Sequence, residues 1–326
     1  MLRENLHLTL DKWGSFFNSK RKGDLLTFDN ELATGSIEVI DCNEKMDLIK
    51  FDVTFHEDFH HPRPKEVEEA PFITLVFGDP FFGGNKVDDN NEDQVINQLN
   101  YNSVGAFCSN SDSNLDWKYR TNEHIKLFIV RISKEYFNYY IHQDKGLTAL
   151  MSLDKVFFVY EEFDNKMIFF YDEAFSMKST EIFYKDRMET LGKAMLNRFF
   201  LNVSIREDIT ESNTYSFNIE PIFKAHRLLE STTDKIIPLE ELSREVGLSE
   251  SRLRFLFKQV FGMTITTFHT NVRLEKAKRL LRERQKTNLM IAMDLGFSSA
   301  SHFSTAFKKK YKITPKEYQT NLSSNS

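Results

Sequence analysis

Residues 289–314 read LMIAMDLGFSSASHFSTAFKKKYKIT, and they repeat a pattern that begins fifty positions earlier. Residues 239–264 read LEELSREVGLSESRLRFLFKQVFGMT. When the two stretches are aligned with this offset, Leu253 matches Phe303 and Phe257 matches Phe307. Both stretches therefore predict the same small helical unit, and one explanation must serve both copies.

A tight turn joins two predicted helices in each copy. The first helix ends at a glycine, Gly247 or Gly296, which adopts the positive φ angle of a helix end without steric cost. A serine follows, Ser249 in the first copy and Ser298 or Ser299 in the second, and its hydroxyl can cap the next helix. Helix, tight turn and helix form a helix-turn-helix, whose second helix enters the major groove of DNA.

Four motifs carry the rest of the pattern, with x for any residue. They read VGLSxSxLxxxFKxxFG at 246–262, RLxxAxxLL at 273–281, GFxSxSxFSxAFKK at 296–309 and TPxxY at 314–318. Together they resemble the DNA-binding domain of the AraC/XylS family of bacterial transcription regulators. The resemblance covers about a third of the chain. It implies an AraC-type DNA-binding domain at 219–326, with helix-turn-helix units at about 239–262 and 289–312.

The charge of the chain is distributed unevenly. The whole sequence of 326 residues holds 43 Lys and Arg against 48 Asp and Glu, a formal net charge of -5. From Glu220 onward, however, there are 19 Lys and Arg against 11 Asp and Glu. A basic part suits a polyanion, because each phosphate that a cation neutralises releases counterions. We therefore expect two domains, of which the C-terminal one binds double-stranded promoter DNA.

Neither a targeting segment nor a catalytic motif is evident in the sequence. No apolar run reaches the roughly 20 residues of a membrane helix, and no N-terminal stretch resembles a signal peptide. Cys42 and Cys108 are too few and too far apart for a disulfide framework or a zinc array. Phosphate loops, dinucleotide fingerprints and nucleophile elbows do not occur. We expect a cytoplasmic, nucleoid-associated protein that has no cofactor, does not enter a membrane and is not an enzyme.

Residues 1 to about 160 are predicted to form mainly short β-strands. Five segments are enriched in β-branched or aromatic residues: 35–40, 48–55, 72–77, 125–132 and 156–160. Many strands with turns between them favour an antiparallel sandwich or barrel. The expected fold class is α+β multidomain, with a mainly β N-terminal domain and an all-α C-terminal domain. In AraC-like regulators a cupin-like barrel that senses a small molecule commonly precedes the DNA-binding domain, and the resemblance implies one here.

Helices at 162–203 are predicted to complete an N-terminal domain at 1–205. The segment 180–203 carries one apolar stripe at steps of three and four: Tyr184, Met188, Leu191, Met195 and Phe199. This face can pack on the β-domain or pair with the same helix of a second subunit, and the resemblance favours a homodimer. A polar stretch without periodicity at 206–218 predicts the linker.

The function of the N-terminal domain is open between several hypotheses. Before Glu220 there are 23 of the 31 phenylalanines, which can line a pocket for a small apolar effector or simply fill the core. A third hypothesis is a module that only dimerises or docks the chain, without a ligand. The resemblance implies a transcription activator that contacts RNA polymerase.

A histidine cluster motivates a rival hypothesis, a cupin-like metalloenzyme domain tethered to DNA. His56, His60 and His61 could hold a transition metal, as histidines and a carboxylate do in cupin enzymes. The His-x-His element of those enzymes does not occur in this sequence, and two prolines follow His61. We therefore expect surface or turn histidines and no metal.

The first predicted recognition helix follows Ser249. Its apolar residues repeat at helical spacing and must face the core: Leu253, Leu256, Phe257 and Val260. The candidate DNA contacts are Ser251, Arg252, Arg254, Phe255 and Lys258. Arg254 can form two hydrogen bonds with guanine, whereas Phe255 can pack on thymine methyl groups or be partly buried. Family members commonly carry a second arginine at the position of Phe255, so hydrogen-bond readout there is expected to be lost.

The second predicted recognition helix has weaker readout groups. Its candidate contacts are Ser301, His302, Ser304 and Thr305. Hydroxyls without an arginine favour water-mediated or methyl-directed readout. Four lysines follow that can reach phosphates: Lys308, Lys309, Lys310 and Lys312. A connector helix from about Thr266 to Arg284 separates the two units, and in the family this spacing sets the recognition helices about one DNA turn apart.

Overall fold

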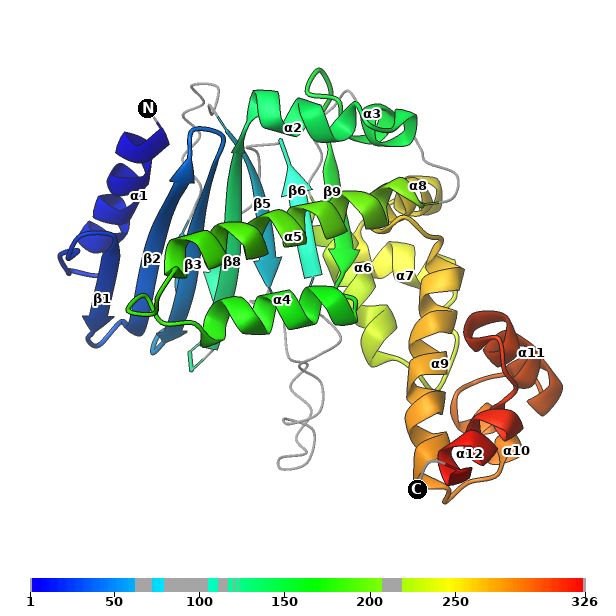
Figure 1. The fold of residues 1–326 in the computed structure, drawn as a ribbon. Helices are drawn as coiled ribbons and strands as arrows, with labels where there is room; N and C mark the ends of the chain where they lie inside the picture. Colours follow the sequence, from blue (N-terminus) through cyan, green and yellow to red (C-terminus); the bar gives the residue numbers. More distant parts are fainter. Residues whose placement is uncertain are drawn as a thin grey trace. The chain divides into compact units, whose positions relative to one another are not determined.

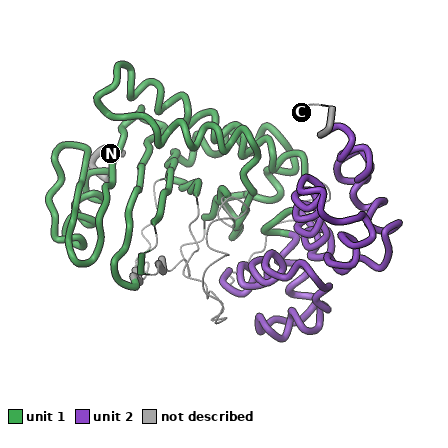
Figure 2. Tube along the Cα trace, turned by 90° about the horizontal axis from the view of Figure 1, so that it is seen from below, with its two compact units in different colours: residues 1–218, 259–262 green, residues 219–258, 263–326 purple. Residues whose placement is uncertain are grey.

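The computed structural model describes residues 2–61, 72–78, 105–110, 117–119, 121–122, 124–206 and 219–324. The chain divides into two compact units (Figure 2). Unit 1 comprises Met1–Asn218 and Gln259–Gly262, and unit 2 comprises Ile219–Lys258 and Met263–Ser326. Of the predicted linker at 206–218, all but Arg206 lies outside the described residues.

Unit 1 is built on one antiparallel sheet of seven strands (Figure 1). The strands are β1 (Leu25–Asp29), β2 (Ala33–Asn43), β3 (Met46–Phe55), β5 (Phe72–Gly78), β6 (Gly105–Ser109), β8 (His124–Ser133) and β9 (Phe158–Glu162). Their order is β1-β2-β3-β8-β5-β6-β9. Two short strands, β4 (Phe59–His61) and β7 (Trp117–Tyr119), pair separately. All five predicted strand segments overlap strands of the large sheet, which confirms a mainly β N-terminal part; its likeness to a cupin stays a prediction.

Helices lie on both faces of this sheet. One face carries α4 (Asn165–Ser176) and α5 (Tyr184–Ser204), with α2 (Lys134–Ile141) and α3 (Lys145–Met151) beside them (Figure 1). The opposite face of β1 to β3 carries α1 (Leu2–Phe16). There the ring of Trp13 lies 5.5 Å from that of Phe51. Helix α1 was not predicted, although Leu6, Leu10 and Trp13 recur at steps of four and three.

The predicted apolar stripe of α5 packs inside unit 1. Met188, Met195 and Phe199 are fully buried in the core cluster that includes Leu48 and Phe77 of the sheet. The interpretation that this face packs on the β-domain is therefore the one observed. Any contact of α5 with a second subunit would have to use another face of the helix.

The turn before α5 differs from the prediction. The helix expected at 180–203 begins at Tyr184, and Phe183 stands before it with a φ of 58° in the left-handed region. Glu181 accepts a hydrogen bond from the backbone N–H of Lys178 at 2.8 Å, which closes a compact turn instead of a helical one. A bulky residue with a positive φ is uncommon because its Cβ crowds the backbone.

Unit 2 is entirely helical. Its helices are α6 (Glu220–Ser231), α7 (Leu239–Val246), α8 (Glu250–Phe261), α9 (Ile265–Glu283), α10 (Asn288–Asp294), α11 (Ala300–Tyr311) and α12 (Pro315–Ser324). The last residues of α8 group with unit 1. None of the described helices of the chain combines the length and apolar character needed to cross a membrane. The all-α C-terminal part of the predicted fold class is confirmed.

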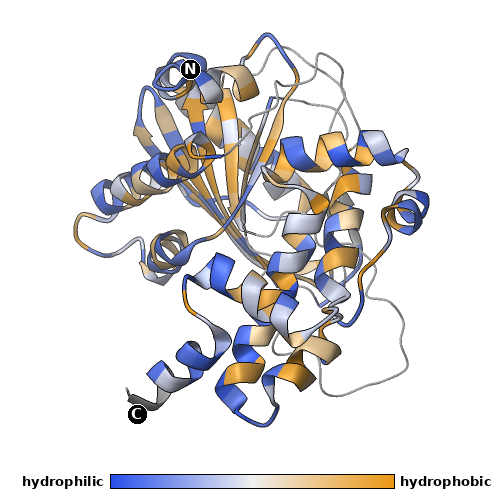
Figure 3. Cartoon of the chain, turned by 90° about the vertical axis from the view of Figure 1, so that its right-hand side faces the viewer, coloured by the Kyte–Doolittle hydropathy of each residue, from blue (hydrophilic) through white to orange (hydrophobic). Residues whose placement is uncertain are grey.

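The repeated apolar residues form the cores of the two helix-turn-helix copies in unit 2. In the second, Phe303 and Phe307 of α11 are fully buried against α9 and α10. In the first, the matching Phe257 is fully buried, and its ring centroid lies 5.5 Å from that of Phe268. In Figure 3 the helices of unit 2 mix hydrophobic and hydrophilic residues along the chain, whereas the strands of unit 1 are largely hydrophobic.

Candidate nucleic-acid interface

Two glycine turns shape the candidate interface. Gly247 and Gly296 have φ angles of 72° and 65°, as the sequence predicted for helix ends. After Gly247, the backbone N–H of Leu248 donates to the carbonyl of Ser243 at 3.1 Å. After Gly296, the N–H of Phe297 donates to the carbonyl of Ala292 at 2.9 Å. The two turns thus use the same hydrogen-bond pattern, 49 residues apart.

A serine caps the second helix of each pair, α8 and α11. The Oγ of Ser249 accepts a hydrogen bond from the backbone N–H of Arg252 at 3.3 Å. The Oγ of Ser299 accepts one from the N–H of His302 at 3.0 Å, so Ser299 rather than Ser298 is the cap of α11. These bonds satisfy N–H groups that the helix itself cannot pair.

Helix α8 separates its apolar and polar residues along two stripes. Leu253, Leu256, Phe257 and Val260 are buried, as predicted. On the other side, Ser251 and Arg254 are exposed, whereas Phe255 and Lys258 are half-buried, and so is Arg252. Four of these residues, at i, i+3, i+4 and i+7, lie on one face of the helix: Ser251, Arg254, Phe255 and Lys258. The predicted outward stripe is therefore present, and the side chain of Phe255 in it is partly buried and partly exposed.

Arg254 is the exposed cation of this stripe, and it pairs with Glu250. Its Nη2 lies 3.3 Å from the Oε2 of Glu250, one helical turn earlier. The side chain of Arg254 is 67% exposed and that of Glu250 is 46% exposed. Because an exposed pair of this kind is worth only about 0.3–0.5 kcal/mol, Arg254 can leave Glu250 for a base at little cost.

Helix α11 presents small polar groups in the equivalent place. Ser301, His302 and Thr305 are exposed, and Ser304 is half-buried. The Nδ1 of His302 lies 3.0 Å from the Oγ of Ser298, and its ring stands edge-on to Phe297 with centroids 5.6 Å apart. His302 is thereby held against the glycine turn.

The lysines at the C-terminal end of α11 fall into two groups. Lys308 and Lys309 are exposed, as expected for phosphate contacts. Lys310 instead turns toward α9, where its Nζ lies 2.9 Å from the Oε1 of Glu275. Burial alone would raise the pKa of Glu275, but the hydrogen bond and the charge of Lys310, together with other neighbouring groups, outweigh it and hold that pKa below its usual value. Lys312 donates to the carbonyl of Lys309 at 3.2 Å.

Comparison with known proteins identifies the domain that contains these two turns. A family model described as a helix-turn-helix domain matches residues 242–321. The probable transcriptional regulator LumQ of Photobacterium leiognathi is 40% identical over 91 residues, which are 28% of this chain and 37% of LumQ. The transcriptional activator RhaS of Mannheimia succiniciproducens is 37% identical over 91 residues, which are 28% of this chain and 34% of RhaS.

A solved structure matches a similar share of the chain. It is a transcriptional regulator of Chromobacterium violaceum with an AraC-type DNA-binding domain, 30% identical over 31% of this chain and 89% of that one, with a TM-score of 0.30. The C-terminal part of the chain, at residues 242–321, is thus an AraC-type helix-turn-helix domain. The chain covers about a third of the length of LumQ and of RhaS.

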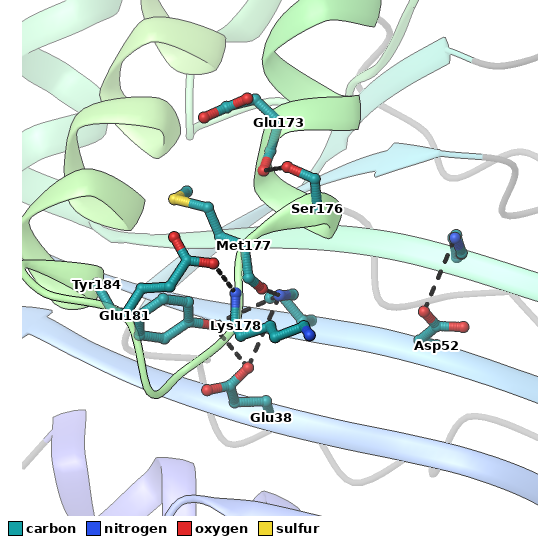
Figure 4. A network of polar contacts seen from close by, with 10 residues as sticks. Glu38, Asp52, Glu173, Ser176, Met177, Lys178, Glu181 and Tyr184 are labelled. Carbon is teal, nitrogen blue, oxygen red and sulfur yellow. Dashed lines mark hydrogen bonds and ion pairs between the residues drawn. The ribbon is translucent and has the colours of Figure 1, made fainter.

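In unit 1, a polar network fastens the turn before α5 to the sheet (Figure 4). The Nζ of Lys50 on β3 donates to the carbonyl of Met177 at 3.2 Å. The hydroxyl of Tyr184 donates to the Oε2 of Glu38 on β2 at 2.7 Å. Burial lowers the pKa of Lys50 and raises that of Tyr184. Sequence reasoning did not find this network, because its members are scattered over the strands and the turn.

The outer face of α5 is a further surface that the sequence analysis did not single out. It follows from Phe183 at steps of four and three through Arg187, Thr190, Ala194 and Asn197 to Leu201, and it is called here the outer stripe. Phe183 is 73% exposed and Leu201 is 51% exposed, at opposite ends of the stripe. The signal was available in the sequence, but the stronger inner stripe masked it.

The histidines of the rival metalloenzyme hypothesis are only partly described. His56 is exposed directly after the last residue of β3, and its Nε2 lies 2.8 Å from the Oγ1 of Thr34. The side chains of His60 and His61 lie outside the described part of the chain. His56 alone therefore has a described partner, and that partner is a hydroxyl.

Proposed function

We propose that this protein is a sequence-specific transcription regulator that inserts α8 and α11 into successive major grooves of promoter DNA. The paired glycine turns, each followed by a capped helix with a polar outward stripe, carry the proposal. The basic balance after Glu220 supplies the sequence-independent part of the affinity. The role is that of a regulator and not of an enzyme.

The length of α9 supports simultaneous binding by both units. This helix has 19 residues and is therefore about 28 Å long. Successive major grooves on one side of DNA lie roughly 34–36 Å apart. A connector that holds the recognition helices somewhat closer than this would bend the DNA toward the protein, at a cost of order 1–6 kcal/mol.

The two helices would contribute unequally to specificity. Arg254 on α8 would form paired hydrogen bonds with guanine, and Phe255 would contact thymine methyl groups. On α11, Ser301, His302 and Thr305 would read bases more weakly, partly through water. Lys258, Lys308 and Lys309 would contact phosphates, with Arg252 and Ser304 at the edges of the two surfaces.

We further propose that unit 1 dimerises the protein through the outer stripe of α5. In an antiparallel pairing centred on Gly192, Phe183 of each subunit faces Leu201 of the other. The same pairing places Arg187 opposite Asn197, and Thr190 opposite Ala194. Large apolar residues thus meet at both ends and small residues meet in the middle, which suits a two-fold, self-complementary contact.

Regulation through dimerisation is favoured over regulation by an apolar effector. The phenylalanines of the unit 1 core that could have lined a pocket pack against one another: Phe137 stacks on Phe157 with ring centroids 5.8 Å apart. Both side chains are fully buried. Packing therefore accounts for these residues, and an effector would act only by binding two states of the chain with different affinity.

Activation is proposed from a relative. RhaS is named as a transcriptional activator. We propose that this protein also activates, through contact with RNA polymerase at the promoter that it occupies.

Selection of binding sites from a random DNA library tests the proposed function. The full chain should select a motif with two patches about one helical turn apart. The Arg254→Ala variant should select a motif that is degraded mainly in one patch. Failure of the full chain to enrich any motif at low salt, with the isolated fragment 206–326 failing too, would refute the DNA-binding proposal.

A further inference from the structure

Three polar residues of α9 lie on one face of that helix, between the two helix-turn-helix units. They are His269, Arg273 and Lys276, at i, i+4 and i+7. His269 and Arg273 are only 3% and 4% exposed. Buried polar side chains need partners, and a cation needs several. Their partners identify what this face of α9 does.

Arg273 holds the turn of the second helix-turn-helix. Its Nη1 donates to the carbonyls of Leu295 and Gly296 at 3.2 and 3.3 Å. Its guanidinium lies 4.7 Å from the ring centroid of Phe297. Carbonyls at the end of α10 have no partner within that helix, so a cation there both satisfies them and meets the negative end of the helix dipole. One side chain thus binds three consecutive residues of the turn that sets the direction of α11.

The two other residues hold the segment that leads into the first helix-turn-helix. The Nε2 of His269 lies 2.6 Å from the carbonyl of Thr232. The Nζ of Lys276 donates to the Oγ1 of Thr233 at 2.6 Å. Thr232 and Thr233 follow α6 directly and precede α7. The same face of α9 therefore forms hydrogen bonds with the second helix-turn-helix copy of unit 2 and with the segment that leads into the first.

The two held segments also touch each other. A Cβ atom added to Gly296 would lie 2.7 Å from the carbonyl oxygen of Asp234 and 3.0 Å from the Cα of Lys235. Backbone atoms cannot move away from such a contact as a flexible side chain can. The turn of the second helix-turn-helix therefore lies directly against the segment that precedes the first helix-turn-helix.

We propose that Arg273, assisted by His269 and Lys276, is a positioning residue for DNA recognition: it fixes the direction of the second recognition helix relative to the first. This proposal rests on the proposed function, since it assigns a role in reading two patches of one site. Arg273 does not touch DNA in this role. It acts through the turn at Leu295 to Phe297.

The proposal predicts an effect that a purely stabilising role would not have. A residue that only stabilises the domain lowers the amount of active protein, so the affinity for every DNA duplex falls by the same factor. A positioning residue changes how well the second patch is read and how strictly the spacing between patches is enforced. The ratio of affinities measured on one protein preparation separates the two roles, because the active fraction cancels.

The test uses the full chain and three duplexes derived from its selected site. The first duplex is intact, the second has the patch read by α11 scrambled, and the third has one base pair inserted between the patches. Three variants are compared with the unaltered chain: Arg273→Met, Arg273→Lys and Arg279→Met. Methionine keeps apolar contact with Phe297 but donates no hydrogen bond. Lysine keeps the positive charge but lacks the planar guanidinium group with its several N–H donors. Arg279 is an exposed arginine of the same helix and controls for the loss of one charge.

Arg273→Met should bind the intact duplex about tenfold more weakly and the scrambled duplex within about twofold of the unaltered chain. It should also lose most of the penalty for the inserted base pair. Arg273→Lys should be intermediate, and Arg279→Met should shift all three duplexes equally. An equal loss on all three duplexes for both Arg273 variants, or no change at all, would overturn the proposal. If the unaltered chain selects no motif, the proposed function itself fails, and the proposal falls with it.

Discussion

Asp47 and Arg131 form a two-bond ion pair between neighbouring strands in the interior of unit 1. The Nε of Arg131 donates to the Oδ1 of Asp47 at 2.6 Å, and its Nη2 donates to the Oδ2 at 2.8 Å. The side chain of Arg131 is 4% exposed and that of Asp47 is 0% exposed. The guanidinium also lies 4.2 Å from the ring centroid of Phe72. Each charge is therefore removed from water and depends on the other.

Arg131→Met should lower the free energy of unfolding of unit 1 by about 3–5 kcal/mol, because it leaves a buried carboxylate without its partner. Urea denaturation followed by tryptophan fluorescence measures this, since Trp13 packs on Phe51 of the sheet. Lys45→Met is the control: the side chain of Lys45 is 57% exposed and pairs with Glu135 at 3.7 Å, so its loss should cost less than about 1 kcal/mol. Equal costs for the two variants would contradict this account of the buried pair.

The two glycine turns provide a matched prediction for unit 2. Gly247→Ala should cost about 1–2 kcal/mol, because alanine is strained at a φ of 72° but meets no atom within 4 Å. Gly296→Ala carries the same strain and in addition brings a Cβ to 2.7 Å from the carbonyl oxygen of Asp234. It should therefore destabilise the domain more than Gly247→Ala does. Hydrogen exchange of peptides from α10 and α11 measures the difference, and an equal or smaller effect at Gly296 would refute the close contact.

The helix-turn-helix units were predictable because each depends on local and repeated signals. A glycine that ends a helix, a serine that caps the next and apolar residues at helical spacing lie within about twenty positions of one another. The burial of Leu253, Phe257 and Phe303 confirms these patterns. The strands of unit 1 were found for the same reason, from alternation within each segment.

Contacts between distant segments were not predictable in this way. Lys310 looked like a phosphate contact because it belongs to a lysine run, but the fold brings Glu275 to its Nζ. The start of α5 at Tyr184 follows from the left-handed backbone at Phe183, which periodicity cannot reveal in a bulky residue. Arg273 was recognised as part of a motif, yet its contacts with the turn at Gly296 appear only in the folded domain.

Arg254→Ala should reduce affinity for the selected site by about 1–3 kcal/mol and relax the base preference in one patch. Arg244→Ala is the matched control. Like Arg254, Arg244 is exposed and pairs with a glutamate four residues earlier, Glu240 at 2.8 Å, but it lies on α7 and not on a recognition helix. Fluorescence anisotropy with intact and base-substituted duplexes measures both. A loss for Arg254→Ala that is the same on every duplex would indicate a phosphate contact instead of a base contact.

If the outer stripe is the dimer interface, substitutions in it should dissociate the dimer, and a complementary pair of substitutions should restore it. Leu201→Glu should convert a dimer into a monomer in sedimentation velocity, because it places a charge opposite Phe183 of the other subunit. Phe169→Glu is the control, since Phe169 is 64% exposed on α4 and does not belong to the stripe.

Phe183→Lys should also dissociate the dimer when it is the only change, and combining it with Leu201→Glu should restore association. In the antiparallel pairing each introduced lysine faces an introduced glutamate of the other subunit, and opposite charges favour that register. In a parallel pairing the lysines would face each other and the double variant would remain monomeric. Failure of the double variant to associate, while the Phe169→Glu control stays dimeric, would therefore exclude the antiparallel contact through α5.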